Sequence, residues 1–178
     1  MNAFRRNNSG QALLELALIM PMLLVFSLGI VDFTRAIYDY EVITNLSGEG
    51  SSMALRNTSL PDTAADIVQY AGNDISMFSN GCVIVTSVYY NGTTYQVTGQ
   101  AISSPCNMGS SKIGCYPPPS SCGNATVPTP IQTVLKNSLK PTIFVTEVYY
   151  NFTPITPVGS FLHNSYLLPS QLYSVAYY

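Results

Sequence analysis

The hydrophobic pattern is strongest near the N-terminus, where the run Gln11–Val31 holds one charged residue, Glu15. A helix of this length reaches roughly 30 Å, which matches the hydrocarbon core of a bilayer. Apolar positions continue at helical spacing past Asp32 as far as Leu46. The pattern therefore predicts one long helix over residues 11–56, with a transmembrane span at about residues 11–31.

The remaining residues, 57–178, are predicted to form one small α+β domain with an antiparallel sheet. Apolar residues recur at helical spacing in residues 62–78, which predicts a helix packed against that sheet. Its apolar face is expected to hold Ala65, Ile67, Val68, Ala71, Ile75 and Phe78. A short helix is predicted over residues 131–138. Runs rich in β-branched and aromatic residues predict strands over residues 82–90, 93–98, 143–151, 161–168 and 172–178.

Two of the predicted strands share a nearly identical sequence. Val85–Asn91 recurs as Val145–Asn151, and the two copies differ only where Glu147 replaces Ser87. Convergent strand composition can produce such a repeat, but the repeat also predicts neighbouring positions in one antiparallel sheet. The Asn91-Gly92 pair predicts a hairpin with a two-residue type I′ turn.

The alternation of side chains along these strands predicts which of them face the core. Glu147 is charged, so the opposite face of its strand is expected to point toward the helices. That face holds Phe144, Thr146, Val148 and Tyr150. The same alternation predicts that the earlier strand contributes Ile84, Val88 and Tyr90 to the core.

The four cysteines predict disulfide bridges. Cys106, Cys115 and Cys122 lie in a Cys-rich loop at residues 101–130, and the fourth is Cys82. None has the CxxC spacing of a zinc knuckle or a redox dithiol, so disulfides fit better than a metal site. Four thiols allow three pairings. Two bridges are expected, and a single bridge or free or metal-bound thiols remain the alternatives.

The chain is poor in charge and in groups suited to catalysis. Charged residues make up 9% of it, against about 25% in ordinary soluble domains. The net charge is −2 and no Lys/Arg cluster occurs, so nucleic-acid binding is not expected. The single histidine, His163, has no nucleophile elbow, metal pair or phosphate loop around it. We therefore expect no enzyme, and no catalytic residue, metal site, cofactor or small-molecule substrate.

The charges that flank the apolar run predict its orientation. Arg5 and Arg6 precede it and Asp32 follows it, which favours a cytoplasmic N-terminus and an extracytoplasmic remainder. That compartment also permits disulfides. A secretory signal peptide is the alternative. However, the run exceeds the usual apolar core of about 7 to 15 residues, and Val31–Arg35 lacks a small-x-small cleavage site.

Glu15 needs an explanation because a carboxylate at the bilayer centre costs up to ~3 kcal/mol. Cleavage after Gly10 would create an α-ammonium on Gln11, one helical turn from Glu15. This ammonium could pair with Glu15 of the same chain or of a neighbouring subunit. The alternative is that Glu15 reaches the interface and has no further role.

The N-terminal residues also carry a family resemblance. The sequence Gly10–Pro21 (GQALLELALIMP), followed by Gly29–Phe33 and by Arg35-Ala36, resembles the TadE-like pseudopilins of tight-adherence (Tad) systems, which are similar to type IV prepilins. The likeness spans about the first 50 residues. It implies a leader at residues 1–10, cut between Gly10 and Gln11 by a prepilin peptidase, and a role for Glu15 in assembly with other pilin or pseudopilin subunits.

This resemblance implies a structural or assembly subunit of a Tad-type pilus or secretion apparatus. It would be a single-pass protein of the bacterial inner membrane with a periplasmic or extracellular C-terminal domain, or would be incorporated in a pilus. The alternative is a membrane-anchored adhesion or binding module that uses the Cys-rich loop and some of the 13 tyrosines. Buried tyrosines with bonded hydroxyls would favour the structural subunit, and an exposed aromatic patch on the loop would favour adhesion.

Overall fold

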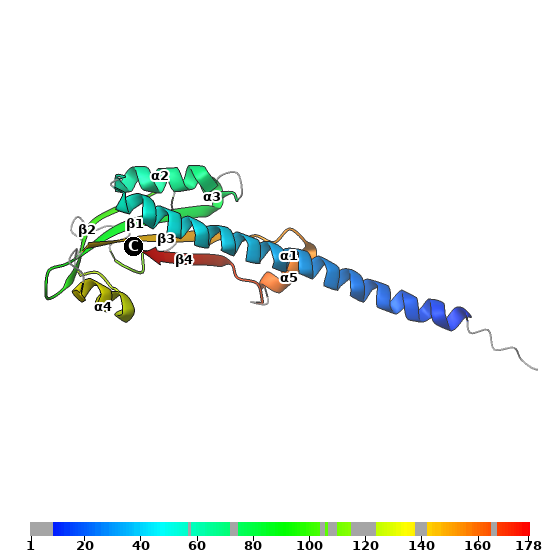
Figure 1. Cartoon of the computed structure of the whole chain (residues 1–178). Coiled ribbons are helices and arrows are strands. Elements are labelled where there is room, and N and C mark those ends of the chain that lie inside the picture. Colours follow the sequence, from blue (N-terminus) through cyan, green and yellow to red (C-terminus); the bar gives the residue numbers. More distant parts are fainter. Residues whose placement is uncertain are drawn as a thin grey trace, which may run out of the picture. The chain divides into compact units, whose positions relative to one another are not determined.

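The computed structural model of the chain describes residues 9–56, 58–71, 75–103, 106, 110–114, 124–137, 142–164 and 167–178 (Figure 1). The helices are α1 (Ser9–Leu55), α2 (Leu60–Ala71), α3 (Met77–Asn80), α4 (Thr129–Asn137) and α5 (Pro157–Asn164). The strands are β1 (Gly81–Tyr90), β2 (Tyr95–Ile102), β3 (Thr142–Asn151) and β4 (Gln171–Tyr177). These elements confirm the predicted α+β class, with one long N-terminal helix followed by an antiparallel sheet.

The chain divides into two compact units. The first combines Met1–Ile37 with Thr153–Pro169, and the second combines Tyr38–Phe152 with Ser170–Tyr178. Helix α1 therefore contributes its N-terminal part to the first unit and its C-terminal part to the second. The sheet lies in the second unit, whereas α5 belongs to the first.

The sheet has the order β2-β1-β3-β4, and each neighbouring pair of strands is antiparallel. The two strands with the repeated sequence, β1 and β3, are paired at its centre, with Thr86 opposite Val145. This pairing confirms the predicted neighbouring placement. Strand β4 pairs with β3, so the predicted C-terminal strand is also confirmed.

The hairpin between β1 and β2 has a longer loop than the sequence predicts. Tyr90 pairs with Tyr95, so four residues separate the strands instead of two. Asn91 Oδ1 accepts hydrogen bonds from the backbone N–H groups of Thr93 at 3.0 Å and Thr94 at 2.8 Å. The two-residue prediction was wrong because this side chain satisfies two backbone donors and stabilises the longer loop.

One face of the sheet is covered by helices. Helix α2 contacts β1 and β2, and the C-terminal part of α1 lies against β3 and β4. The hydroxyls of Ser47 and Ser174 are 3.0 Å apart. A Cβ on Gly50 would lie 2.9 Å from Thr146 Cγ2, so only glycine allows this close approach of α1 to the sheet. Thr146 thus points toward the helices, as the alternation predicts.

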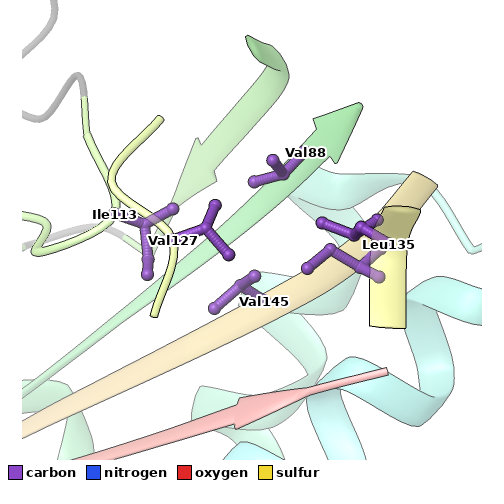
Figure 2. Packing of buried hydrophobic residues seen from close by; sticks show 6 residues of the cluster. Val88, Ile113, Val127, Leu135 and Val145 are labelled. Carbon is purple, nitrogen blue, oxygen red and sulfur yellow. The ribbon is translucent and has the colours of Figure 1, made fainter. Parts of the chain in front are cut away.

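The opposite face of the sheet is covered by the region that was predicted to be a Cys-rich loop. Its core cluster joins β1 and β3 to α4 and to loop residues, namely Val88, Ile113, Val127, Leu135, Ile143 and Val145 (Figure 2). A second cluster on this face contains Cys82, Ile84 and Tyr149. Ile84 and Val88 are therefore buried as predicted, but they lie on the face of Glu147 and not on the helix-covered face that the alternation indicated, because Ile84 pairs with Glu147. Tyr90 packs against the edge of this core. Both faces of the sheet are buried, which alternation along one strand does not reveal.

The predicted helix over residues 62–78 is wrong at its C-terminal end. Helix α2 ends at Ala71, and the separate short helix α3 follows, so Ile75 and Phe78 are not part of α2. Phe78 is exposed, as is Ala65, which was also expected in the core. Gly72 and Asn73 follow Ala71 in the sequence, and both residue types disfavour helix.

The predicted strand over residues 161–168 is also wrong, because Phe161 lies in helix α5. Pro157 occupies the first helical position, where its missing N–H costs nothing. Thr156 Oγ1 accepts a hydrogen bond from Gly159 N at 2.9 Å and so caps the helix. The predicted short helix over residues 131–138 is confirmed as α4.

Cys82 and Cys106 form a disulfide with a Cα–Cα distance of 5.0 Å. It ties the start of β1 to the chain that follows β2. This bridge confirms that cysteines of the second unit are crosslinked. The other two candidates, Cys115 and Cys122, lie outside the described residues.

Candidate functional site

The N-terminal part of α1 exposes an apolar surface over most of its length. From Leu13 to Phe26, the large hydrophobic side chains are each at least 50% exposed, as are Ile30 and Val31, whereas Leu28 is partly buried. The helix is long and apolar enough to cross a membrane, and its most apolar window has no buried residue. Such a surface is consistent with a single-pass membrane anchor, because a soluble protein rarely leaves so large an apolar patch in water.

Glu15 lies on this apolar helix, and Gln11 is its neighbour on the same face. Gln11 Nε2 donates a hydrogen bond to Glu15 Oε1 at 3.2 Å, across one helical turn. Gly10 is open, because apart from its chain neighbours and the backbone of its own helix no atom of the described residues lies within 4 Å of a Cβ built there. The structure therefore brings two of the predicted site residues together, and leaves the third accessible beside them.

A buried carboxylate, Asp32, lies just after the apolar run. It is fully buried, and Oδ1 accepts a hydrogen bond from Ile155 N at 2.9 Å. Its Oδ2 accepts hydrogen bonds from Thr156 N at 3.2 Å and from the hydroxyl of Thr156. One carboxylate thus satisfies three donors at the start of α5, and holds residues that follow it by more than a hundred positions.

The surroundings of Asp32 set both its charge state and its packing. Burial alone would raise the pKa of Asp32, but the hydrogen bonds from Thr156 and Ile155 and the charge of Arg35 outweigh it and lower that pKa. The Arg35 side chain also donates a hydrogen bond to Thr153 O at 3.4 Å. Gly159 packs directly against the Asp32 carboxylate and leaves no room for a Cβ.

A second buried carboxylate, Glu147, organises the Cys-rich side of the sheet. Glu147 is fully buried and accepts hydrogen bonds from Lys112 N at 2.8 Å, from Tyr173 OH at 3.0 Å and from Tyr149 OH at 3.3 Å. The Ser111 hydroxyl is a fourth donor. Lys112 Nζ lies 3.5 Å from the centre of the Tyr173 ring, a cation–π contact. This network fixes a loop segment onto β3.

The tyrosines of this network remain hydrogen-bond donors. Burial raises the pKa of Tyr149, Tyr173 and Tyr177, and the negative charge of Glu147 raises each of them further. These hydroxyls therefore stay protonated at neutral pH. Buried tyrosines with bonded hydroxyls are the feature expected of a structural subunit.

Neither buried carboxylate was predicted as a site residue. Asp32 entered the sequence analysis only as a flanking charge, and Glu147 only as a marker of one strand face. The Thr156-Pro157 pair, with glycine at residue 159, is a helix-start signal that would have indicated α5. No local pattern indicates that Asp32 is its partner.

Groups suited to catalysis or metal binding are scarce in the part of the chain that the structure describes. Among those residues no group of three or more His, Cys, Asp or Glu side chains could hold a metal ion. His163 lies on α5, partly buried, and its Nδ1 has no hydrogen-bond partner among the described residues. The features described above, an exposed apolar helix and two buried carboxylates that bind distant segments, suit membrane anchoring and internal packing.

The described residues combine one long apolar N-terminal helix, consistent with a single-pass membrane anchor, with an α+β fold built on an antiparallel sheet. Residues 10–51 match the family model described as TadE-like protein, which confirms the predicted resemblance over that segment. The matched segment includes Gly10, Gln11, Glu15 and Asp32. Neither a curated protein nor a solved structure matches the chain.

Proposed function

We propose that this chain is a non-enzymatic, pseudopilin-like structural or assembly subunit of a Tad-type pilus or secretion apparatus. Residues 11–31 would span the bacterial inner membrane, with a cytoplasmic N-terminus and a periplasmic or extracellular domain. The observation that carries the proposal is the TadE-like match over a helix whose most apolar window has no buried residue. The buried, bonded tyrosines around Glu147 support a structural subunit over an adhesion module.

Processing is the second part of the proposal. A prepilin peptidase would cut between Gly10 and Gln11 and remove residues 1–10. The open surroundings of Gly10 support this, because a protease must reach the backbone on both sides of the bond. Cleavage leaves the new α-ammonium of Gln11 one turn from Glu15, where the Gln11 side chain already donates to that carboxylate.

Assembly would use the same two residues. A Glu15 carboxylate in hydrocarbon carries a cost of up to ~3 kcal/mol, which an ammonium of a neighbouring subunit would offset. Lateral association of apolar helices would then bury both the charge and the exposed side chains. Other pilin or pseudopilin subunits are the partners that this chemistry fits.

Mass spectrometry of the N-terminus tests the processing step. The protein is purified from cells with and without the prepilin peptidase, and the terminus is expected at Gln11 only when the peptidase is present. A Gly10→Val variant is the matched control and should stay uncut, because a bulky residue replaces the open glycine. An intact Met1 in both strains would contradict processing, and a terminus beyond Asp32 would indicate ordinary secretion.

A further inference from the structure

Residues 153–169 form a segment without any Asp, Glu, Lys or Arg (TPITPVGSFLHNSYLLP). It includes α5, and it belongs to the same compact unit as the N-terminal part of α1. The segment mixes apolar residues with uncharged polar ones, so no charged side chain opposes its contact with an apolar phase.

The segment is attached to α1 at the end of the predicted membrane span. A Cβ on Gly29 would touch Val158 and Leu162 of α5, each at 3.9 Å. Asp32 binds the start of α5, as described above. Figure 1 shows α5 beside α1. If residues 11–31 span a bilayer, α5 lies where α1 leaves it.

Three large apolar side chains of the segment are exposed near the end of the proposed span. Ile155 is 68% exposed, Phe161 72% and Leu167 71%. On the open faces of α1 beside them, large apolar side chains are exposed as well, namely Phe26, Ile30 and Phe33. The apolar surface of the anchor therefore continues onto the segment.

Several backbone groups at the two ends of α5 are bonded within the protein. The first N–H groups of a helix normally require water or a cap. Here Asp32 accepts from the N–H groups of Ile155 and Thr156, and the Thr156 hydroxyl accepts from Gly159. At the other end, Leu162 O accepts from Leu167 N at 3.0 Å. Such internal satisfaction suits contact with lipid.

We infer that residues 153–169 form a second membrane contact, which lies in the headgroup and upper acyl region at the end of the span. Ile155, Phe161 and Leu167 contact lipid, and Asp32 is the positioning residue that holds α5 against α1. The inference rests on the proposed membrane anchoring of α1. A lipid surface is the proposed partner because α5 packs on α1 at Gly29, next to exposed apolar side chains of the proposed span.

Fluorescence tests this inference directly, because the chain has no tryptophan. A Phe161→Trp variant of the full chain is reconstituted in phosphatidylcholine vesicles with or without brominated acyl chains. We expect a blue-shifted emission that brominated lipid quenches at least about twofold, most strongly with bromine near the headgroup. A Tyr70→Trp variant reports a residue of the second unit that is 77% exposed, and should be quenched less.

A Leu18→Trp variant separates the inference from the proposed function on which it rests. Quenching of Leu18→Trp without quenching of Phe161→Trp would leave the anchor intact and overturn the second contact. If neither is quenched, the membrane anchor fails and the inference fails with it. A blue-shifted Phe161→Trp emission that brominated lipid does not quench would mean that protein, such as a second copy, covers α5, and this also overturns the inference.

Discussion

At the scale of single residues, two buried carboxylates hold the chain together over long sequence distances. Asp32 binds the backbone at the start of α5, and Glu147 binds the loop at Ser111 and Lys112. Each carboxylate is surrounded by hydrogen-bond donors, which is how a buried charge is tolerated in a protein interior. Both residues therefore have structural roles that their position in the sequence does not indicate.

The hydrogen bonds of Asp32 predict a local effect of Asp32→Asn. An amide keeps one acceptor but loses the charge, and hydrogen bonds to a charged group contribute about 1.5–3 kcal/mol. At neutral pH we therefore expect the backbone amides of Ile155 and Thr156 to exchange hydrogen at least about tenfold faster than in the wild type. Hydrogen exchange of these two amides, followed by mass spectrometry or NMR, measures it.

The same interaction predicts a pH dependence. The pKa of Asp32 is lowered below 3.8 in the folded chain, so its stabilising contribution is fully present above that value and is lost as the pH falls through the lowered pKa. Glu41→Gln removes an exposed acid of the same helix and is the matched control. Unchanged protection of Ile155 and Thr156 in Asp32→Asn would show that the carboxylate does not hold α5.

At the scale of elements, the sequence predicts those that depend on local patterns. Helix α1 and strands β1, β3 and β4 follow from apolar periodicity and β-branched residues, and the repeated sequence correctly places β1 next to β3. Helix α5 was predicted as a strand, because its apolar residues fit both patterns and its stabilising partner is Asp32. The sequence also did not predict that Ile113, Val127 and α4 pack on the sheet face that holds Glu147, because this packing depends on contacts between residues far apart in the chain.

The Cys82–Cys106 disulfide links β1 covalently to the chain that follows β2. It closes a loop with a sequence separation of 24, for which chain entropy predicts a stabilisation of about 3.5 kcal/mol. We expect a Cys82→Ser/Cys106→Ser variant to lose about that much free energy of unfolding. Denaturant unfolding in detergent, followed by circular dichroism, measures the loss.

Peptide mapping without reduction provides the matching control for the pairing. It should recover Cys82 linked to Cys106, in wild type and also in a Cys115→Ser/Cys122→Ser variant. A peptide that joins Cys82 to Cys115 or to Cys122 would contradict the pairing. It would also mean that the loop covers the sheet in a different register.

At the scale of the whole molecule, the exposed apolar surface of α1 is consistent with a membrane anchor. The large side chains from Leu13 to Phe26 are exposed, and the most apolar window of the helix has no buried residue. Under the proposed function, lipid covers this surface before assembly and neighbouring subunits cover it afterwards. Glu15 distinguishes the two states, because a carboxylate is unfavourable in lipid and favourable beside an ammonium.

Because the Glu15 carboxylate is unfavourable in lipid and favourable beside an ammonium, we predict that Glu15 acts in assembly rather than in membrane insertion. A Glu15→Ala variant should insert at least as well as the wild type, because it removes a charge from the apolar run. Its incorporation into higher-order complexes should fall roughly tenfold, which corresponds to a loss of about 1.4 kcal/mol of association free energy. Membrane fractionation measures insertion, and crosslinking of purified membranes followed by quantification of the complexes measures incorporation.

The matched variant Glu15→Gln separates charge from shape. The amide keeps the size and hydrogen-bonding capacity of the side chain, including a carbonyl acceptor for Gln11, but it cannot form an ion pair with the ammonium of a cleaved neighbour. If the ion pair directs assembly, Glu15→Gln should be as defective as Glu15→Ala. Full incorporation of both variants would leave packing of the exposed apolar side chains as the force that brings subunits together, and would remove Glu15 from the assembly mechanism.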